Sequence, residues 1–360
     1  MATNNANSRP ISTYPIPASI QTKLNKAGFL TTGSVLNLRP SELSSSICAE
    51  ISVEDAADVL DLVGKPMGKF LDTKTALEIL REEQLLHPIV TLSQNVDEIL
   101  CGGVPLSKVT EISGIAGVGK TQLCLQLCVT VQIPEECGGI QGQAIFIDTE
   151  GSFNASRLED MSQACVEHCR KTMNLPVDAW SLASIRENIF VYRCKEVTDL
   201  LSCVMILKEF LKSHRQVKLI VIDSLAFHFR HDLENTALRS RVLHKIAAEL
   251  SRMAVDFGTA VVVTNQMTTK FDSKGQGRLT PALGTSWGHA PTLRFILDWD
   301  PSRSFRWATL IKSSSLPSGS APYQVTKDGI RDVFFEKEIV TPPVVIVEDG
   351  IPGICFNTIV

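Results

Sequence analysis

The segment from Gly114 to Thr121 most constrains what this chain can fold into. It reads G-x-x-x-x-G-K-T and stands between a β-prone segment at 109–113 and a helix-patterned segment at 122–131. In that setting the glycines let backbone N–H groups surround a phosphate chain, and the helix N-terminus adds partial positive charge. The lysine reaches the outer phosphates, and the threonine hydroxyl can hold Mg²⁺. The pattern predicts a nucleoside triphosphate site; the alternative is a glycine-rich turn with an accidental Lys-Thr.

Length and charge set limits on the rest of the chain. The 360 residues favour two domains, or one large domain with an appendage. Lys and Arg total 35 against 39 Asp and Glu, for a net charge of −4. No bulk basic field exists to hold nucleic acid, so any such contact must come from local loops.

The ten cysteines lack C-x-x-C spacing, and the polar start of the chain has no secretory leader pattern. We therefore expect reduced thiols and a reducing compartment, the nucleus or the cytoplasm. No apolar run approaches the length of a membrane span, so no membrane association is expected.

The pattern of the chain predicts several parts. We expect disorder at 1–12, a small all-helical domain at 13–64, a linker and helix at 65–88, an ATPase core at 89–335 and an unassigned tail at 336–360. In the core, apolar strand candidates alternate with amphipathic helices, which predicts an α/β fold with a mainly parallel sheet covered on both faces. The strand candidates are 109–113, 144–148, 189–193, 218–223 and 260–264, followed by an antiparallel extension at 292–298, 305–311 and 323–326.

Two strand candidates end in carboxylates. The apolar run at 218–222 ends in Asp223, which paired with the phosphate loop predicts the second half of an Mg²⁺–nucleotide site. The run at 144–147 ends in Asp148, and Glu150 follows at the edge where open α/β sheets bind ligands. Glu150 is a candidate base for a water attacking the γ-phosphate; the alternative is an N-cap or a solvated loop acid.

A third strand candidate, 260–264, is followed by an uncharged amide, Gln266, which could report the presence of a γ-phosphate to the segment behind it. That segment, 267–281, is expected to be a basic loop suited to sequence-tolerant single-strand binding, or simply a solvated loop. A second basic segment, which we expect to be mobile, follows Asp223 at 228–231, with Arg239 and Arg241 after it. The candidate DNA-binding residues are Arg230, His231, Lys270, Phe271, Lys274 and Arg278.

Together, several segments resemble the RecA-type strand-exchange ATPases of the eukaryotic branch. The resemblance is carried by 114–122, 146–153, 219–224 and 264–267, and 25–29 is similar to the helix-hairpin-helix domain of that branch. It covers about 17–331. Within the branch, 227–233, 265–270 and 281–290 most resemble a recombinase paralogue.

The resemblance implies a RecA-like P-loop ATPase core that binds ATP and Mg²⁺ between neighbouring subunits and holds single-stranded DNA. The implied partners are other recombinase paralogues in a hetero-oligomer and the main recombinase filament, in the nucleus, with the cytoplasm as a second compartment. Glu150, Lys120 and Gln266 take the catalytic roles, and Thr121 and Asp223 hold the metal. The implied ATP-binding residues are Gly114, Ile115, Ala116, Gly117, Val118, Gly119, Lys120, Thr121, Gln122, Arg157, Asp223, His289 and Lys312.

The sequence departs from the filament-forming members in three places. Thr73 aligns with the phenylalanine that inserts into the next subunit, which predicts weaker self-polymerisation. Lys312 occupies what resembles an acidic position in those members. Its ammonium could therefore replace a bound metal cation beside the phosphates. The segment 49–52 lacks the Gly-x-Gly of a DNA-clasping hairpin.

Two functions remain open at this point. The first is a DNA-dependent ATPase subunit, with weak turnover, that assists homologous recombination and double-strand break repair. The second is a non-hydrolysing adaptor in which ATP stabilises subunit interfaces. A P-loop kinase is a third class, but no lid or acceptor pocket is recognisable in the sequence.

Overall fold

The computed structural model describes residues 9–47, 50–64, 74–173, 176, 179–231, 236–271, 277–299 and 303–333. The chain divides into two compact units, residues 1–83 and 84–360. Residues 1–8, the part 65–73 of the expected linker and helix at 65–88, and the tail at 336–360 lie outside the described residues.

The first unit is helical. Its elements, in chain order, are the short 3-10 helix η1 (Ile11–Thr13), α1 (Ala18–Lys26), a second short 3-10 helix η2 (Thr32–Ser34), α2 (Pro40–Ser46) and α3 (Val53–Gly64). Their apolar faces meet in a small core that includes the fully buried Leu24, Leu43 and Val35. Helix α4 (Ala76–Gln84) begins in this unit and ends at its boundary.

Residues 9–12 differ from the expected disorder. Ile11 is fully buried in the core of the first unit, and its N–H donates to the carbonyl of Leu30. The backbone N–H of Arg9 donates to the hydroxyl of Thr32 at 3.1 Å. The polar composition of the terminus concealed this single apolar anchor, which is enough to fix the segment against the helices.

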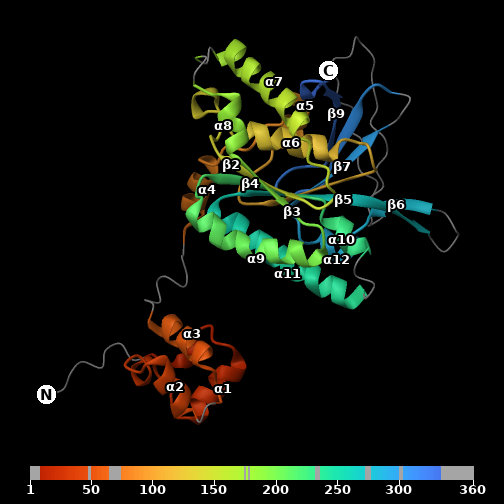
Figure 1. Ribbon diagram of the computed structural model, residues 1–360. Helices are drawn as coiled ribbons and strands as arrows, with labels where there is room; N and C mark the ends of the chain where they lie inside the picture. Colours follow the sequence, from red (N-terminus) through yellow and green to blue (C-terminus); the bar gives the residue numbers. More distant parts are fainter. Residues whose placement is uncertain are drawn as a thin grey trace. The chain divides into compact units, whose positions relative to one another are not determined.

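The second unit is built on one mixed sheet, with ten strands in the part of the chain that the structure describes (Figure 1). The order across the sheet is β10-β9-β8-β7-β1-β5-β4-β2-β3, and β6 pairs with β5 outside that path. β7, β1, β5, β4, β2 and β3 run parallel, and the strands beyond β7 are antiparallel. The strands are β1 (Val109–Gly114), β2 (Gln143–Asp148), β3 (Ile189–Arg193), β4 (Val217–Asp223), β5 (Ala260–Phe271), β6 (Gly277–Pro281), β7 (Leu293–Trp299), β8 (Arg306–Lys312), β9 (Gly319–Thr326) and β10 (Gly329–Asp332).

Helices cover both faces of this sheet, as Figure 1 shows. One layer holds α5 (Gln94–Ile99), α6 (Lys120–Thr130), α7 (Ala155–Met173) and α8 (Leu182–Glu187). The other holds α9 (Val197–Ser213), α10 (Leu225–His231), α11 (Thr236–Phe257) and α12 (Gly284–Gly288). The predicted α/β fold with a RecA-like core and a mainly parallel sheet is therefore confirmed.

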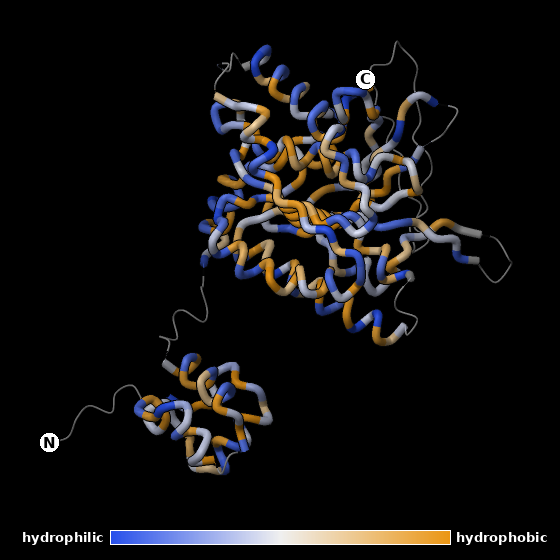
Figure 2. The backbone as a smooth tube through the Cα atoms, viewed as in Figure 1, coloured by the Kyte–Doolittle hydropathy of each residue, from blue (hydrophilic) through white to orange (hydrophobic). Residues whose placement is uncertain are grey.

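The strand residues alternate between the two cores. In β2, Ala144 and Phe146 join the core beneath α6 and α7, whereas Ile145 and Ile147 join the core beneath α9 and α11. Figure 2 shows the resulting apolar band running through the sheet between more polar helix surfaces. Because both faces are buried, these strands are near-continuous apolar runs, which is why the sequence marked them clearly.

Two parts of the core differ from the sequence-based expectation. Residues 267–271 and 277–281, expected to be a loop, are strands: β5 continues to Phe271 and pairs antiparallel with β6, Lys270 lying opposite Arg278. Threonine and phenylalanine favour this extended hairpin. Residues 228–231, expected to belong to a basic, mobile segment, lie instead in α10, whose own residues Leu225 and Phe229 are fully buried.

None of the described helices combines the length and the apolar character that crossing a membrane requires.

Candidate nucleotide-binding site

The phosphate loop joins the end of β1 to the start of α6. Gly117 has φ of +78° and Gly119 has φ of +106°, backbone conformations that favour glycine. Gly114 is constrained by space, because an added Cβ would lie 2.8 Å from the carbonyl oxygen of Leu297. The loop therefore needs glycines where the motif has them, and it leads directly into the N-terminus of α6.

Lys120 places its ammonium inside the loop. The Nζ atom donates to the carbonyls of Gly114 and Ile115, both at 2.9 Å. Burial lowers the pKa of Lys120, while the carboxylates of Asp223 and Glu150 act in the opposite direction. The Lys120 ammonium therefore lies inside the loop, where the carboxylates of Asp223 and Glu150 favour its charged form.

Asp223 lies at the end of β4 and receives three hydroxyls. Thr121 donates to Oδ2 at 2.6 Å, Ser152 to the same oxygen at 3.4 Å, and Thr264 to Oδ1 at 2.5 Å. Burial raises the pKa of Asp223, and the Thr121 and Thr264 hydroxyls lower it. The loop after β2, the end of β4, the middle of β5 and the first turn of α6 thus bring polar side chains to one point.

This cluster fits a magnesium ion. The Thr121 hydroxyl and the Asp223 carboxylate, the predicted metal residues, are in direct contact, and the Ser152 hydroxyl is beside them. Hard oxygen donors in small number suit Mg²⁺, which keeps several waters and binds through carboxylates together with substrate phosphates. The donor set and the adjacent phosphate loop are consistent with one Mg²⁺–nucleotide site.

Glu150 lies beside this cluster and is exposed. Its Oε1 accepts from the hydroxyl of Ser224 at 2.5 Å and from Nε2 of Gln266 at 2.8 Å. The amide of Gln266 in turn accepts from Nη1 of Arg230 at 2.8 Å. Three predicted site residues from different segments are therefore linked side by side: the candidate base, the candidate sensor and a candidate DNA-binding arginine.

Arg157, at the start of α7, joins the nucleotide loop to the far hairpin. Its Nε donates to Oε1 of Gln122 at 2.6 Å, and Nη2 donates to the carbonyl of Thr326 at 2.6 Å. Nη1 donates to the carbonyl of Lys327. Two predicted ATP-binding residues thus contact each other, and Arg157 holds the β9–β10 turn against the start of α6.

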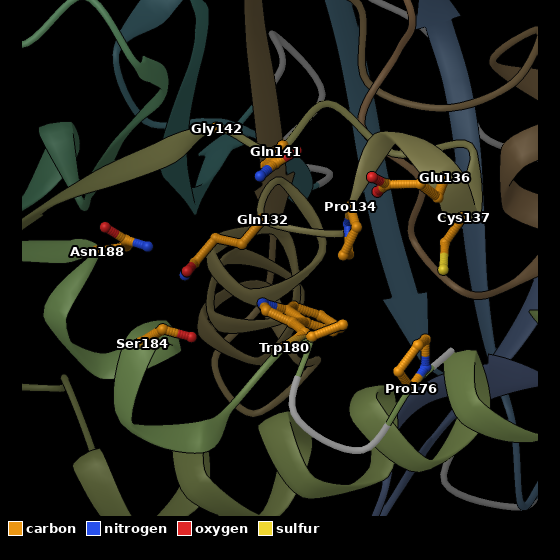
Figure 3. Close-up of a pocket in the computed structure, with 11 residues that line it drawn as sticks. Gln132, Pro134, Glu136, Cys137, Gln141, Gly142, Pro176, Trp180, Ser184 and Asn188 are labelled. Atoms are coloured by element: carbon orange, nitrogen blue, oxygen red, sulfur yellow. The ribbon is translucent and has the colours of Figure 1, made fainter. Parts of the chain in front are cut away.

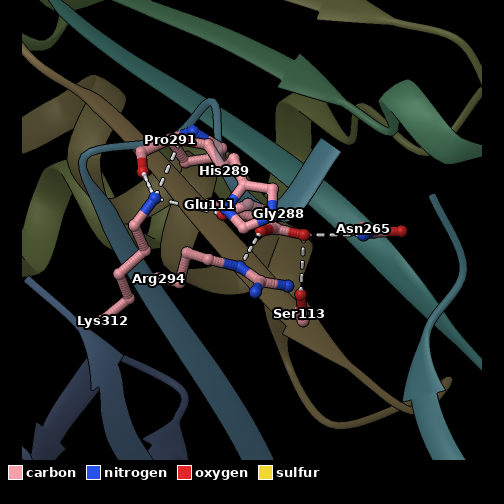
Figure 4. Close-up of polar contacts among 8 residues, drawn as sticks. All are labelled: Glu111, Ser113, Asn265, Gly288, His289, Pro291, Arg294 and Lys312. Carbon is pink, nitrogen blue, oxygen red and sulfur yellow. Dashed lines mark hydrogen bonds and ion pairs between the residues drawn. The ribbon is translucent and has the colours of Figure 1, made fainter. Parts of the chain in front are cut away.

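His289 and Lys312 form a separate group, on the β7 and β8 side of β1. The ammonium of Lys312 donates to the carbonyls of Gly288, His289 and Pro291 at 3.1, 2.9 and 2.7 Å (Figure 4). The His289 side chain is exposed. All three hydrogen bonds of Lys312 go to this turn and none to the phosphate loop.

The candidate DNA-binding residues lie on two elements. Lys270 is exposed near the end of β5, and Phe271 and Arg278 belong to the same β5–β6 hairpin. Arg230 and His231 belong to α10, which contacts β5. Lys274 lies outside the described residues, between the two strands of the hairpin.

Several polar residues of the site were missed in the sequence. Ser152, Ser224 and Thr264 each donate a hydroxyl to one of the two acids. Each stands next to, or within two residues of, a residue already singled out at a strand end, so position alone was the available signal. Glu111 was also missed, although a carboxylate within an apolar strand requires a partner.

The structure also contains a cavity of about 470 Å³ that is lined in part by Gln132, Trp180 and Asn188 (Figure 3). Asn188 and Gly142 precede β3 and β2, so the cavity lies at the starting edge of these strands. The acids of the nucleotide site lie at the opposite edge, where the strands end. The cavity is therefore not part of that site.

Comparison with known proteins finds relatives of this chain among DNA repair and recombination proteins. A DNA repair protein RAD51 homolog 3 from Cricetulus griseus is 42 % identical over 90 % of this chain and 92 % of its own length. A second protein of that name, from Dictyostelium discoideum, is 38 % identical over 69 % of this chain and 66 % of its own. A DNA repair and recombination protein RadA from Aeropyrum pernix is 33 % identical over 86 % of this chain and 92 % of its own.

The resemblance to a recombinase paralogue of the eukaryotic branch, predicted from 227–233, 265–270 and 281–290, is confirmed by the two RAD51 homolog 3 proteins. The family model described as Rad51 matches residues 81–333, which contain the whole described sheet and the phosphate loop. With that match and these relatives, the chain belongs to the Rad51 family.

Proposed function

We propose that this chain is an ATP-hydrolysing, DNA-stimulated subunit of a complex of recombinase paralogues that assists homologous recombination and double-strand break repair. The observation that carries the proposal is the contact between Glu150 and Ser224, the residue directly after Asp223. Asp223 in turn contacts Thr121 of the phosphate loop. The candidate base is thus linked to the nucleotide site by two hydrogen bonds.

In this proposal ATP and Mg²⁺ bind at the phosphate loop, with Lys120 near the outer phosphates and Thr121 and Asp223 as metal ligands. Mg²⁺, when bound, neutralises developing charge on the phosphates. Glu150 orients the attacking water and accepts its proton. Gln266, which contacts Glu150 and Arg230, passes the presence of the γ-phosphate to α10 and the β5–β6 hairpin.

Single-stranded DNA is the ligand that the hairpin and α10 would hold, through Arg230, His231, Lys270, Phe271, Lys274 and Arg278. Basic side chains beside an aromatic suit sequence-tolerant binding of single strands. The names of the relatives, DNA repair and recombination proteins, support this assignment. The relative from Cricetulus griseus also supports a nuclear location.

Other subunits are the proposed protein partners, namely recombinase paralogues and the main recombinase filament. β3 is the last strand of the sheet, so its outer edge has no strand partner in the described residues. Val191 within β3 is 39 % exposed, and Met205 and Ile206 on α9, the helix that follows β3, are 70 % and 54 % exposed. An open strand edge with apolar neighbours is suited to another chain.

Hydrolysis separates this proposal from the adaptor alternative. In single-turnover assays with Mg²⁺-ATP, Glu150→Gln should bind nucleotide as the wild type does but hydrolyse it about 10²-fold more slowly or worse, the usual loss for a general base. Glu167→Gln, an exposed acid on α7, is the matched control and should hydrolyse normally.

Equal turnover in Glu150→Gln and wild type would remove Glu150 from the role of base. Undetectable turnover in the wild type, with ATP still needed for complex formation with other paralogues, would replace the enzyme by the adaptor.

A further inference from the structure

A buried carboxylate lies beneath the phosphate loop. Glu111, in the middle of β1, is fully buried, and its two oxygens bind side chains from both neighbouring strands (Figure 4). Nε of Arg294 on β7 donates to Oε2 at 2.5 Å, and Nδ2 of Asn265 on β5 donates to Oε1 at 2.6 Å. The Ser113 hydroxyl also donates to Oε1 of Glu111, at 3.1 Å. A buried charge is stable only with such partners.

On its other side the arginine supports α12. An added Cβ on Gly288, the last residue of α12, would lie 2.8 Å from Nη1 of Arg294. The guanidinium therefore fills the space directly beneath this glycine. Because Arg294 is fixed by Glu111, the end of α12 rests on a group that cannot move independently of β1.

Lys312 fastens the turn that follows. It lies directly across from Arg294 in the β7–β8 register, and its three ammonium N–H groups meet three carbonyls, those of Gly288, His289 and Pro291. One of these carbonyls belongs to His289 itself, and the other two belong to residues before and after it in the chain. A single ammonium with all three donors used therefore fixes the backbone that carries His289.

The other end of the network reaches the nucleotide edge. Asn265, which binds Glu111, directly precedes Gln266, which binds Glu150. Polar contacts and the peptide bond between Asn265 and Gln266 thus run from Glu150 to Arg294, whose guanidinium lies against Gly288 at the start of the His289 turn.

We propose that Lys312, together with the Glu111–Arg294 pair, is a positioning device: it holds the His289 turn in the geometry in which His289 meets the nucleotide of a neighbouring subunit. For that last step the inference rests on the proposed function and on the resemblance, which implies that His289 binds ATP at a site between neighbouring subunits. Lys312 then acts through the backbone of the turn, and not on the nucleotide that the chain's own phosphate loop binds.

The test uses Lys312→Met, which removes the ammonium and keeps most of the side-chain length. Backbone amides of 288–290 should exchange with deuterium about tenfold faster or more, since the turn loses the hydrogen bonds from Lys312. The dissociation constant for Mg²⁺-ATP should stay at the wild-type value, and kcat of the assembled protein should fall at unchanged KM. Lys171→Met, at an exposed lysine on α7, should change none of these.

Chemical rescue guards against a merely damaged fold. Lys312→Ala leaves the three carbonyls facing an empty space, and ammonium chloride should restore slow exchange in the turn. Tetramethylammonium chloride at the same ionic strength should not, because that ion has no N–H donors and is too large.

Unchanged exchange in Lys312→Met, or exchange that ammonium does not restore, would overturn the positioning role. A loss of ATP affinity as large as that of Lys120→Ala would overturn it as well, since Lys312 would then act on the chain's own nucleotide. Failure of the proposed function looks different: the wild type would not hydrolyse ATP, whereas the effect of Lys312 on exchange would persist.

Discussion

The side-chain amide of Gln266 bridges Glu150 and Arg230, with Nε2 donating to Glu150 and Oε1 accepting from Arg230, each at 2.8 Å. The carboxylate can only accept and the guanidinium can only donate, so this orientation of the amide satisfies both neighbours. One side chain thus contacts the candidate base and a candidate DNA-binding residue at the same time. In the proposed function, a change at the γ-phosphate that moved Glu150 would reach Arg230 through this single residue.

Gln266→Ala removes this bridge. In the wild type, ATP should tighten the binding of single-stranded DNA; in the variant, DNA affinity should be the same with and without ATP. ATP binding itself should change little, because Lys120, Thr121 and Asp223 are untouched. Fluorescence anisotropy of a labelled strand, titrated with and without ATP, measures the difference.

The control for that experiment is Gln163→Ala, an exposed glutamine on α7, which should retain the wild-type response to ATP. An ATP response of wild-type size in Gln266→Ala would contradict the bridging role.

The basic hairpin can be tested through salt dependence. Four cationic contacts, from Arg230, Lys270, Lys274 and Arg278, imply a log–log salt slope of roughly −3, at about −0.7 per neutralised phosphate of a single strand. Neutralising Lys270, Lys274 and Arg278 together should flatten that slope by about two units. Affinity should fall for strands of any sequence, because phosphates carry no sequence information.

A triple neutralisation of Lys171, Lys212 and Arg252, each in an exposed ion pair on a helix, changes the net charge by the same amount. It should leave the slope close to that of the wild type. An unaltered slope in the hairpin variant would place the DNA site elsewhere.

Asp97 predicts a pH dependence of stability. Burial raises its pKa to about 7, although the backbone N–H of Thr91 donates to it at 2.9 Å and acts in the opposite direction. The folded state therefore keeps a proton that the unfolded state releases near pH 4. Stability should fall as pH rises from about 4 to 7, by about 4 kcal/mol at most.

Asp97→Asn keeps an acceptor for the Thr91 N–H but does not ionise, so it should be more stable than the wild type at pH 8 and lose that advantage at pH 5. Thermal unfolding followed by tryptophan fluorescence reports on the correct unit, since all four tryptophans lie between 180 and 307. Asp160→Asn, an exposed acid on α7, is the control. A constant difference between wild type and Asp97→Asn across this range would disprove the assignment.

The phosphate loop gives a backbone prediction. At Gly119 (φ of +106°) an alanine is strained by about 1–2 kcal/mol, and its Cβ would lie 3.2 Å from Val325. Gly119→Ala should therefore lower both stability and ATP affinity. Gly138→Ala provides the match, with φ of +75° but nothing within 4 Å of the added Cβ. It should lose stability alone; equal ATP affinities in the two variants would contradict the loop assignment.

Much of the candidate nucleotide site was predictable because its signals are local. The glycines and Lys120 of the phosphate loop lie within eight residues, and the strand that ends in Asp223 is an uninterrupted apolar run. Such runs mark strands buried on both faces, and in a parallel sheet their ends meet at one edge. The contact between Thr121 and Asp223, 102 residues apart, follows from these two facts.

The parts that were missed depend on pairings that no short segment contains. Glu111 and Arg294 are 183 residues apart, and only the β1–β7 register brings them together. The extension of β5 into a hairpin required β6 as a partner, and the basic and glycine residues between them resemble a loop. Helix α10 depends on the burial of Phe229, which the surrounding histidines and arginine concealed.

The central claim is that the cluster around Lys120 binds Mg²⁺-ATP. Titration calorimetry of the wild type and of Lys120→Ala, with Lys327→Ala as the control for an exposed lysine outside the loop, tests it directly. The account predicts that Lys120→Ala loses most of its affinity for Mg²⁺-ATP, with a tenfold fall for each ~1.4 kcal/mol of lost interaction. Lys327→Ala should stay close to the wild type. Equal affinity of Lys120→Ala and wild type for Mg²⁺-ATP would contradict it.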